Sequence, residues 1–164
     1  LVSGCTGRKA IANILFGKCS PSGKLPVTFY NSVDDLPDFC DYSMQNRTYR
    51  YFKGDVQYPF GYGKTYTKFA LENAEVRENK IRATVKNIGK FENETVLQLH
   101  VTCPKAEFET PIKSLIGFKR ISLKPQEEKE FVFEIDENSL MSVNDNGKKV
   151  LLKGEYTFTL NRRL

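Results

Sequence analysis

Hydrophobic and polar residues alternate with a period of two over much of the chain after residue 68. Strict alternation turns one set of side chains toward a core and the other set, here including Gln98 and His100, toward solvent. Turns separate the runs, and Asn146-Gly147 is typical of a tight hairpin because this pair tolerates positive φ. About seven strands in roughly 95 residues predict a two-sheet β-sandwich. The inward positions are Ile81, Ala83, Val85, Leu97, Leu99, Val101, Phe131, Phe133, Ile135, Tyr156, Phe158 and Leu160.

The first quarter of the chain has a different pattern, in which only one helix and one strand can be recognised. Residues 8–16 place hydrophobic side chains on one face at helical spacing, and Gly17 is suited to end that helix. A turn at 21–23 leads to a short strand at 25–29, and polar residues follow as far as Pro37. A helix and a strand cannot enclose a core, so this part is expected to pack on the missing remainder of a sheet.

The stretch between Asn46 and Thr67 is rich in aromatic residues and also contains two arginines and the closely spaced Gly61 and Gly63. Aromatic rings beside small, flexible residues suit either a carbohydrate-facing loop or a rigid seam between two domains. Composition alone does not separate these two uses. The aromatic residues are Tyr49, Tyr51, Phe52, Tyr58, Phe60, Tyr62 and Tyr66.

Two motifs in this stretch carry a family resemblance. Arg-Thr-Tyr-Arg-Tyr-Phe at 47–52 and Tyr-Pro-Phe-Gly-Tyr-Gly at 58–63 resemble the end of the second domain of glycoside hydrolase family 3, the β-glucosidase and β-xylosidase family. One departure is Lys64, which stands where that family often has Leu. Further pieces similar to the family occur in the same order at 10–17, 21–29, 115–120 and 153–156.

The resemblance implies a mainly β fold, in which a fibronectin type III-like (immunoglobulin-like) β-sandwich follows the C-terminal fragment of an α/β sandwich domain. Residues 1–45 would then be the tail of the α/β domain, 46–67 the interdomain seam, and 68–164 the β-sandwich. The partners that it implies are the missing N-terminal barrel and α/β domains of a longer parent chain. The first four residues lack an initiator Met and signal-peptide features, which also predicts a piece of something longer.

The activity implied by the resemblance belongs to the parent chain. It is that of a retaining β-glycosidase, which releases terminal non-reducing β-linked sugars from an oligosaccharide substrate through a glycosyl-enzyme intermediate. The choice between glucoside and xyloside stays open. The alternative is a non-catalytic β-sandwich module that binds carbohydrate or protein, or a purely structural brace. The absence of Trp argues against a flat polysaccharide-binding platform.

No catalytic residue is expected in this chain, so the fragment alone is predicted to be inactive. Glycosidases use two carboxylates, and the family places its Asp nucleophile in the barrel and its Glu acid/base upstream in the second domain; no position here matches either motif. Asp34, Asp35, Asp38 and Asp41 are interpreted as surface carboxylates. His100, the only histidine, lacks a nucleophile partner and is expected to be an exposed strand residue. Outward-facing acids expected opposite lysines are Glu128, Glu130 and Glu134.

Arg47, Tyr49 and Phe60 are the candidates for contact with a sugar. The competing and favoured interpretation is that the aromatic residues of this stretch wedge two domains together, because such rings bury a large area and keep a polar tip. Arg47 and Arg50 would then bond carbonyls or carboxylates across the interface, where a planar guanidinium is favoured.

Composition argues against several other classes. The net charge of +5 comes from 25 basic and 20 acidic residues spread along the 164-residue chain, so no nucleic-acid-binding face is expected. No run of about 18 apolar residues occurs, so no membrane span is expected. The four cysteines form no C-x-x-C pair, and neither a metal site nor a cofactor is expected. Glycosylation sequons at Asn46 and Asn93 leave a cytoplasmic or a secreted location open.

Overall fold

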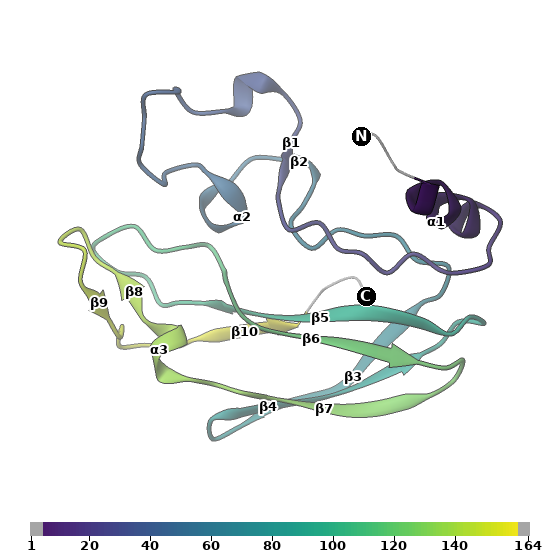
Figure 1. The fold of residues 1–164 in the computed structure, drawn as a ribbon. Helices are drawn as coiled ribbons and strands as arrows, with labels where there is room; N and C mark the ends of the chain where they lie inside the picture. Colours follow the sequence, from purple (N-terminus) through teal and green to yellow (C-terminus); the bar gives the residue numbers. More distant parts are fainter. Residues whose placement is uncertain (1–4, 161–164) are drawn as a thin grey trace.

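The protein consists of a β-sandwich and an N-terminal part that lies on one of its outer faces (Figure 1). The structure is a computed structural model that describes residues 5–160. All strand pairs in it are antiparallel. The elements of the N-terminal part are α1 (Cys5–Leu15), β1 (Phe29–Tyr30), the 3₁₀ helix η1 (Val33–Asp35), α2 (Thr48–Tyr51) and β2 (Val56–Tyr58).

The sandwich has two three-stranded sheets, with strand orders β3-β4-β7 and β10-β5-β6. β8 and β9 form a short hairpin, and the turn between them contains Asn146 and Gly147, as the sequence predicts. Gly147 has the positive φ, +73°, that such a turn needs. The bounds are β3 (Phe69–Arg77), β4 (Lys80–Asn87), β5 (Asn93–Thr102), β6 (Ser114–Leu123), β7 (Glu128–Glu134), α3 (Glu137–Leu140), β8 (Ser142–Val143), β9 (Lys149–Val150) and β10 (Thr157–Leu160).

The hydrophobic core lies between these two sheets and is built from the inward set of the alternating strands. The predicted mainly β fold and the predicted inward faces of β4 and β5 are therefore confirmed. Burial of such side chains stabilises the fold by roughly 1.5–3 kcal/mol each. The buried cluster comprises Phe69, Ile81, Ala83, Val85, Leu97, Leu99, Ile121, Leu123, Phe133 and Leu160.

The N-terminal part has its helix close to where the sequence predicts it, but the predicted strand at 25–29 is wrong. Only Phe29 and Tyr30 pair with β2. Leu25 instead makes two backbone hydrogen bonds to the loop after β2, donating to the Tyr62 carbonyl at 2.8 Å and accepting from Gly61 N–H at 2.8 Å. Pro26 then has no N–H with which to continue a ladder, so pairing stops and resumes only at Phe29.

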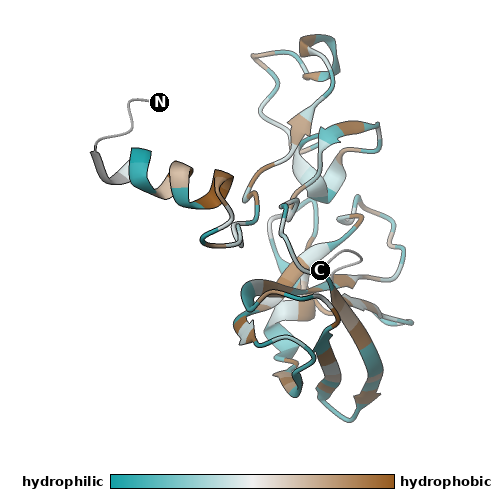
Figure 2. Cartoon of the chain, turned by 90° about the vertical axis from the view of Figure 1, so that its right-hand side faces the viewer, coloured by the Kyte–Doolittle hydropathy of each residue, from teal (hydrophilic) through white to brown (hydrophobic). Residues whose placement is uncertain are grey.

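No side chain between residues 7 and 45 is buried. Figure 2 shows α1 extending away from the rest of the chain, with hydrophobic residues near its C-terminal end. None of the described helices is long and apolar enough to cross a membrane. Large hydrophobic side chains exposed in this part are Ile11, Leu15, Phe16, Val27, Phe29, Val33, Leu36, Phe39, Tyr42 and Met44.

Candidate functional site

The aromatic stretch packs on the outer face of β5, around His100. The rings of Tyr49 and Phe60 stack on each other with centroids 4.1 Å apart and an interplanar angle of 20°. Both rings meet the imidazole of His100 edge-on, at centroid distances of 6.0 Å and 6.1 Å. His100 is only 6% exposed, so the expectation of an exposed strand histidine is wrong. Its side chain does point away from the core, but α2 and the Phe60 loop cover that face.

The environment of His100 keeps its imidazole neutral at pH 7. Burial, together with the positive charge of Lys113, lowers the pKa of His100 from 6.5 to about 4. Its Nε2 atom has no hydrogen-bond partner among residues 5–160. A neutral imidazole at the side of a stacked aromatic pair serves as packing surface.

Polar contacts join α2 to β6 and to the loop that precedes β6. The hydroxyl oxygen of Tyr49 accepts a hydrogen bond from Leu115 N–H at 3.1 Å. The carbonyl of Arg50 accepts a hydrogen bond from Ile112 N–H at 2.6 Å. Tyr49 therefore contributes both its ring face and its polar tip to the contact with the sandwich, which is the use expected of an aromatic seam.

The two arginines of the stretch do not bridge the interface in the way predicted. Arg47 does bind backbone carbonyls, those of Ser43, Asp38 and Asp41, but all three belong to the loop that precedes it. Its guanidinium therefore holds its own loop closed, because the loop folds back within reach of it. The guanidinium carbon of Arg50 lies 5.6 Å from the centroid of the Tyr51 ring, a cation–π contact.

Two glycines allow this loop to approach the rest of the molecule closely. Gly61 has φ +81°, and a Cβ on it would lie 2.4 Å from Oε1 of Gln98. A Cβ on Gly63 would lie 2.2 Å from the carbonyl oxygen of Gly23. Glycine is required at 61 by the positive φ and at 63 by the backbone oxygen that faces it, so these two residues let the loop lie against β5 on one side and the 23–25 segment on the other.

Further hydrogen bonds tie the N-terminal part to the start of β5. The Asn93 side chain donates to the Pro21 carbonyl at 3.1 Å and to Oγ1 of Thr65 at 2.6 Å. The Tyr66 hydroxyl donates to the carbonyl of Ile14 in α1 at 2.8 Å. Of the two sequons, Asn93 is buried and has its amide engaged, whereas Asn46 is exposed.

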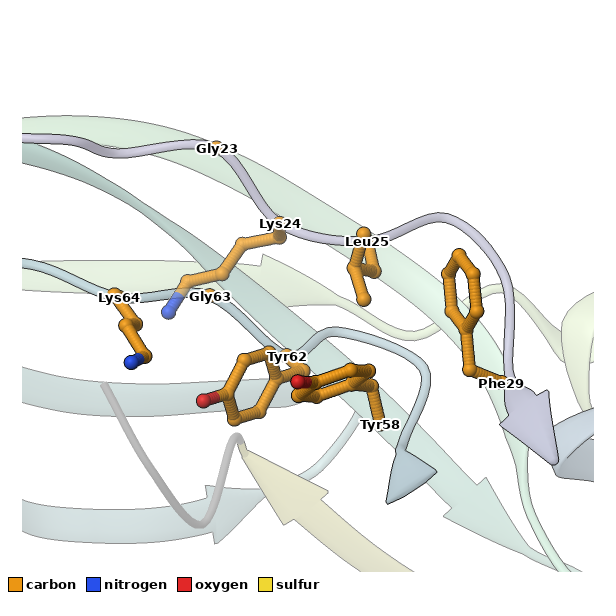
Figure 3. Close-up of a pocket in the computed structure, with 8 residues that line it drawn as sticks. All are labelled: Gly23, Lys24, Leu25, Phe29, Tyr58, Tyr62, Gly63 and Lys64. Carbon is orange, nitrogen blue, oxygen red and sulfur yellow. The ribbon is translucent and has the colours of Figure 1, made fainter. Parts of the chain in front are cut away.

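A groove lies beside this seam, on the outside of the 23–25 and 58–64 segments (Figure 3). Its volume is about 560 Å³. The Tyr58 ring stands between two others, at centroid distances of 5.0 Å from Tyr62 and 6.1 Å from Phe29. Sequence reasoning found the tyrosines but missed Lys24, since nothing in its local pattern shows that it would lie over Gly63. We call this the Tyr58 groove; it is lined by Gly23, Lys24, Leu25, Phe29, Tyr58, Tyr62, Gly63 and Lys64.

The carboxylates near these features have structural partners. Asp38 and Asp41 accept backbone hydrogen bonds from Cys40 and Ser43, and those from Ser43 lower the pKa of Asp41.

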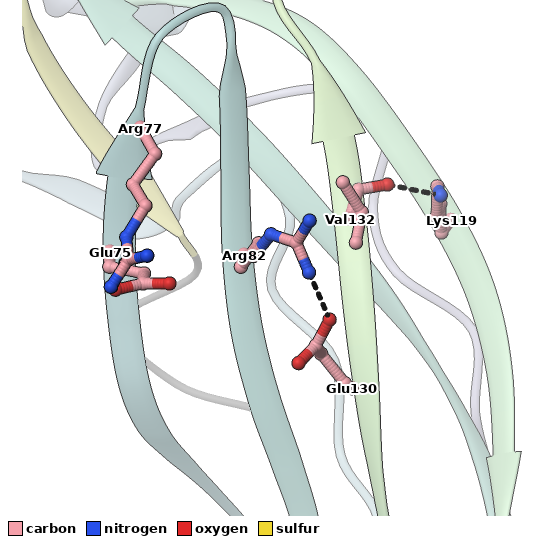
Figure 4. A network of polar contacts seen from close by, with 6 residues as sticks. All are labelled: Glu75, Arg77, Arg82, Lys119, Glu130 and Val132. Atoms are coloured by element: carbon pink, nitrogen blue, oxygen red, sulfur yellow. Dashed lines mark hydrogen bonds and ion pairs between the residues drawn. The ribbon is translucent and has the colours of Figure 1, made fainter.

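On the opposite sheet, Arg82 pairs with Glu130 at 3.1 Å across β4 and β7 (Figure 4). The expected lysine partners are confirmed for Glu128 and Glu134, which pair with Lys86 and Lys80, whereas Glu130 faces an arginine instead. Within residues 5–160 no group of three or more His, Cys, Asp or Glu could hold a metal ion.

Two family models match the chain in sequence order. Residues 1–66 match the glycosyl hydrolase family 3 C-terminal domain, and residues 95–163 match the fibronectin type III-like domain. The chain belongs to glycoside hydrolase family 3. It is 37% identical over 89% of its length to a periplasmic beta-glucosidase of Salmonella typhimurium, and 41% identical over 74% to a xylan 1,4-beta-xylosidase of Xylanibacter ruminicola.

Solved structures of the family have the same fold over this region. Beta-glucosidase 3B from Thermotoga neapolitana matches 98% of the chain with a TM-score of 0.88 and 28% identity. The GH3 beta-glucosidase of Bifidobacterium adolescentis matches 96% with a TM-score of 0.85 and 29% identity. The chain spans 22% and 14% of the two curated relatives and 25% and 26% of these two structures. It therefore corresponds to a minor portion of each of these proteins.

Proposed function

We propose that this chain is the non-catalytic C-terminal portion of a retaining β-glycosidase. The parent hydrolyses terminal non-reducing β-linked glucose or xylose in an oligosaccharide. The observation that carries this proposal is the match, in order along one chain, of the family 3 C-terminal domain and the fibronectin type III-like domain. The relatives are several-fold longer than this chain. In this proposal residues 1–45 are the tail of the α/β sandwich domain, 46–67 the seam and 68–164 the fibronectin type III-like β-sandwich.

Two carboxylates with a shifted pKa support a non-catalytic role for the chain. A glycosidase acid needs a raised pKa at its working pH, next to a second, ionised carboxylate. The pKa values of Asp41 and Glu127 are shifted the opposite way, since hydrogen bonds from Ser43 and Lys129 respectively stabilise the ionised forms. These groups suit loop closure and surface pairing rather than proton donation.

The exposed hydrophobic side chains of the N-terminal part support the proposal that further domains of the parent chain pack against it. Phe39 is 92% exposed, and Leu15, Phe16 and Val33 are also largely exposed. Large apolar side chains exposed to this degree are what absent neighbouring domains would leave uncovered. The occupants that fit the proposal are the upstream barrel and the rest of the α/β domain of the parent chain.

The proposal is tested by assaying the 164-residue chain and the intact parent on aryl β-glucosides and aryl β-xylosides. The parent is expected to turn over at least one substrate class with retention, and its two kcat/KM values decide between glucoside and xyloside. The isolated chain is expected to be inactive. Activity of the chain that survives repurification, and that is lost on mutating one of its own acids, would overturn the proposal.

A second proposal is a direct sugar contact through Arg47, Tyr49 and Phe60. The observation in its favour is that the Tyr49 and Phe60 rings are only half-buried. Against it, Arg47 is bonded to its own loop, and the two rings pack on His100. We therefore favour the seam as their role, with kinetics of Phe60→Ala in the intact parent as the test.

A further inference from the structure

Two lysines bring uncompensated positive charge to one end of the Tyr58 groove. Figure 3 shows the ammonium groups of Lys24 and Lys64 pointing to the same end, beside the phenol of Tyr62. The Lys24 side chain crosses Gly63, with Cδ 2.9 Å from the place where a Cβ would stand on that glycine. Neither lysine forms an ion pair with a carboxylate in the described part of the chain.

The position of Lys24 makes its charge costly unless an anion accompanies it. Its side chain is half-buried, and burial lowers its pKa from the ordinary value. Lys64 brings a second ammonium group to the same end of the groove. A bound anion would compensate both charges at once.

The rest of the groove is aromatic and exposed. Tyr58 is 39% exposed and Phe29 46% exposed, although both rings contact a neighbouring ring. The Tyr58 and Tyr62 rings are tilted by 45° to each other, which presents an angled apolar floor with two hydroxyl groups. The volume of about 560 Å³ falls in the range of roughly 300–1,000 Å³ usual for small-molecule sites.

The walls of the groove are fixed before any ligand binds. Leu25 is hydrogen-bonded to Gly61 and to Tyr62, and Gly63 lies in close contact with Gly23. These contacts hold the segment that carries Lys24 against the segment that carries Lys64 and both tyrosines. A site that is already ordered loses little conformational freedom on binding, which favours affinity.

We propose that the Tyr58 groove is a non-catalytic binding site for a carboxylate-bearing sugar, such as a uronic acid unit of an oligosaccharide. The carboxylate lies between the ammonium groups of Lys24 and Lys64, and the pyranose ring packs its C–H face on Tyr58 and Tyr62. A neutral sugar leaves the two ammonium groups without a counter-charge, and a small inorganic anion leaves the aromatic floor uncovered. This site goes beyond the proposed hydrolase function because it requires no bond cleavage.

The test is calorimetric titration of the 164-residue chain with xylotriose that carries one glucuronic acid unit. Unsubstituted xylotriose and sodium phosphate serve as the two reference ligands. The acidic oligosaccharide is expected to bind more tightly than either, and its affinity is expected to fall as salt is raised toward about 1 M, where charges are screened within roughly 3 Å. Lys64→Leu should weaken its binding by about tenfold, which corresponds to ~1.4 kcal/mol.

Matched variants separate the charge from the rings. Lys148→Leu removes the same charge from the distant β8–β9 hairpin and should leave binding unchanged. Tyr58→Leu should weaken binding of the acidic oligosaccharide without changing the response to phosphate. Thermal melts establish that each variant is folded. Lys64 is exposed, so Lys64→Leu is expected to have the same melting temperature as the unsubstituted 164-residue chain.

Three results would overturn the proposal. Equal binding of neutral and acidic xylotriose would show that the lysines do not select the ligand. Phosphate binding as tight as that of the oligosaccharide would reduce the site to an anion site. Binding by the 164-residue chain that disappears in the intact parent would identify the groove as a surface covered by upstream domains. None of these results depends on hydrolysis, so they are separate from a failure of the proposed hydrolase function.

Discussion

The imidazole of His100 packs edge-on against the ring of Tyr49, with 6.0 Å between their centroids and an interplanar angle of 79°. Tyr49 belongs to the N-terminal part and His100 to the central strand of one sheet. Together with Phe60, the pair forms the aromatic contact that joins the two parts. The contact contains a titratable ring, so the stability of this junction is coupled to pH.

We predict that acidification from pH 6.5 to pH 4 destabilises the chain through His100. Its pKa in the folded state is about 4, below the unfolded value of 6.5, so between these pH values the unfolded state binds a proton that the folded state excludes. The loss begins below pH 6.5 and levels off below pH 4, with an upper bound of roughly 3 kcal/mol. Denaturant melts of the chain and of His100→Phe at several pH values measure it.

The variant isolates this contribution because all other titrating groups are common to both proteins. The chain should lose more stability than His100→Phe between pH 6.5 and pH 4. If the two free-energy curves run parallel over that interval, His100 is not held neutral by the seam and the prediction fails.

A second prediction concerns Phe60, which stacks on Tyr49 at 4.1 Å and is half-buried. Phe60→Ala should destabilise the chain by about 2–3 kcal/mol, less than the ~3–5 kcal/mol of a fully buried Phe. Phe39→Ala, at a residue 92% exposed, is the control and should change little. An unchanged melting temperature for Phe60→Ala, with reduced kcat/KM in the intact parent, would favour a sugar-facing ring instead.

The period-two pattern predicted the core of the sandwich because the inward residues Ile81, Ala83 and Val85 of β4, and Leu97, Leu99 and Val101 of β5, are hydrophobic. It could not predict the burial of Gln98 and His100, which lie on the outer face of β5. A polar residue at an outward position has the same local pattern whether water or another segment covers it. The fold reveals the cover, through the rings of Tyr49 and Phe60 on His100 and the close approach of Gly61 to Gln98.

Other misses have similar physical causes. The strand predicted at 25–29 has suitable β-branched and aromatic residues, but Pro26 and the hydrogen bonds of Leu25 to the Gly61–Tyr62 loop confine pairing to Phe29 and Tyr30. The Tyr58 groove needed the fold as well, because Lys24 and Lys64 are distant in sequence. The family motifs identified both segments, yet they do not state which side chains meet.

A third prediction concerns Asn87, which is 0% exposed and fully hydrogen-bonded. Its Oδ1 accepts from Thr67 and Gly89, and its Nδ2 donates to the Phe91 and Leu123 carbonyls at 2.8 Å and 3.0 Å. Asn87→Asp would place a carboxylate against those two carbonyls, so we expect a loss of about 3–5 kcal/mol, as for other buried unpaired charges.

The comparison for this substitution is Asn146→Asp in the exposed hairpin turn, where the same change should cost little. Chemical denaturation of both variants at pH 7 gives the two free energies. Equal stability of the two variants would show that the Asn87 hydrogen bonds do not hold the β4–β5 loop in place.

A fourth prediction uses two glycines that face each other across the seam. Gly63→Ala would place a Cβ 2.2 Å from the Gly23 carbonyl oxygen, a backbone atom that can move only with its whole segment. The variant should lose about 1–3 kcal/mol, as other overpacked sites do. Gly23→Ala is the matched control, because nothing lies within 4 Å of its added Cβ. Similar melting temperatures for the two variants would rule out a close approach at Gly63.

A fifth prediction is that residues 67–164 fold without the N-terminal part. All members of the buried hydrophobic cluster lie between Phe69 and Leu160, whereas no side chain from 7 to 45 is buried. Thr67 must be retained because its hydroxyl donates to Asn87. Since ordering costs about 1–2 kcal/mol per residue for the backbone alone, a segment that buries so little apolar area contributes little to the stability of the sandwich.

Limited proteolysis of the 164-residue chain should therefore cut first within 7–45 and leave the β-sandwich, and the isolated 67–164 segment should melt cooperatively. Removing Tyr49 and Phe60 also uncovers His100, so its pKa should rise toward 6.5 and the difference from His100→Phe between pH 6.5 and pH 4 should vanish in this shorter segment. Early loss of the sandwich, with 7–45 protected in a monomer, would contradict the prediction. A His100 pKa that stays near 4 in the short segment would show that the sandwich itself, rather than the aromatic seam, keeps the ring neutral.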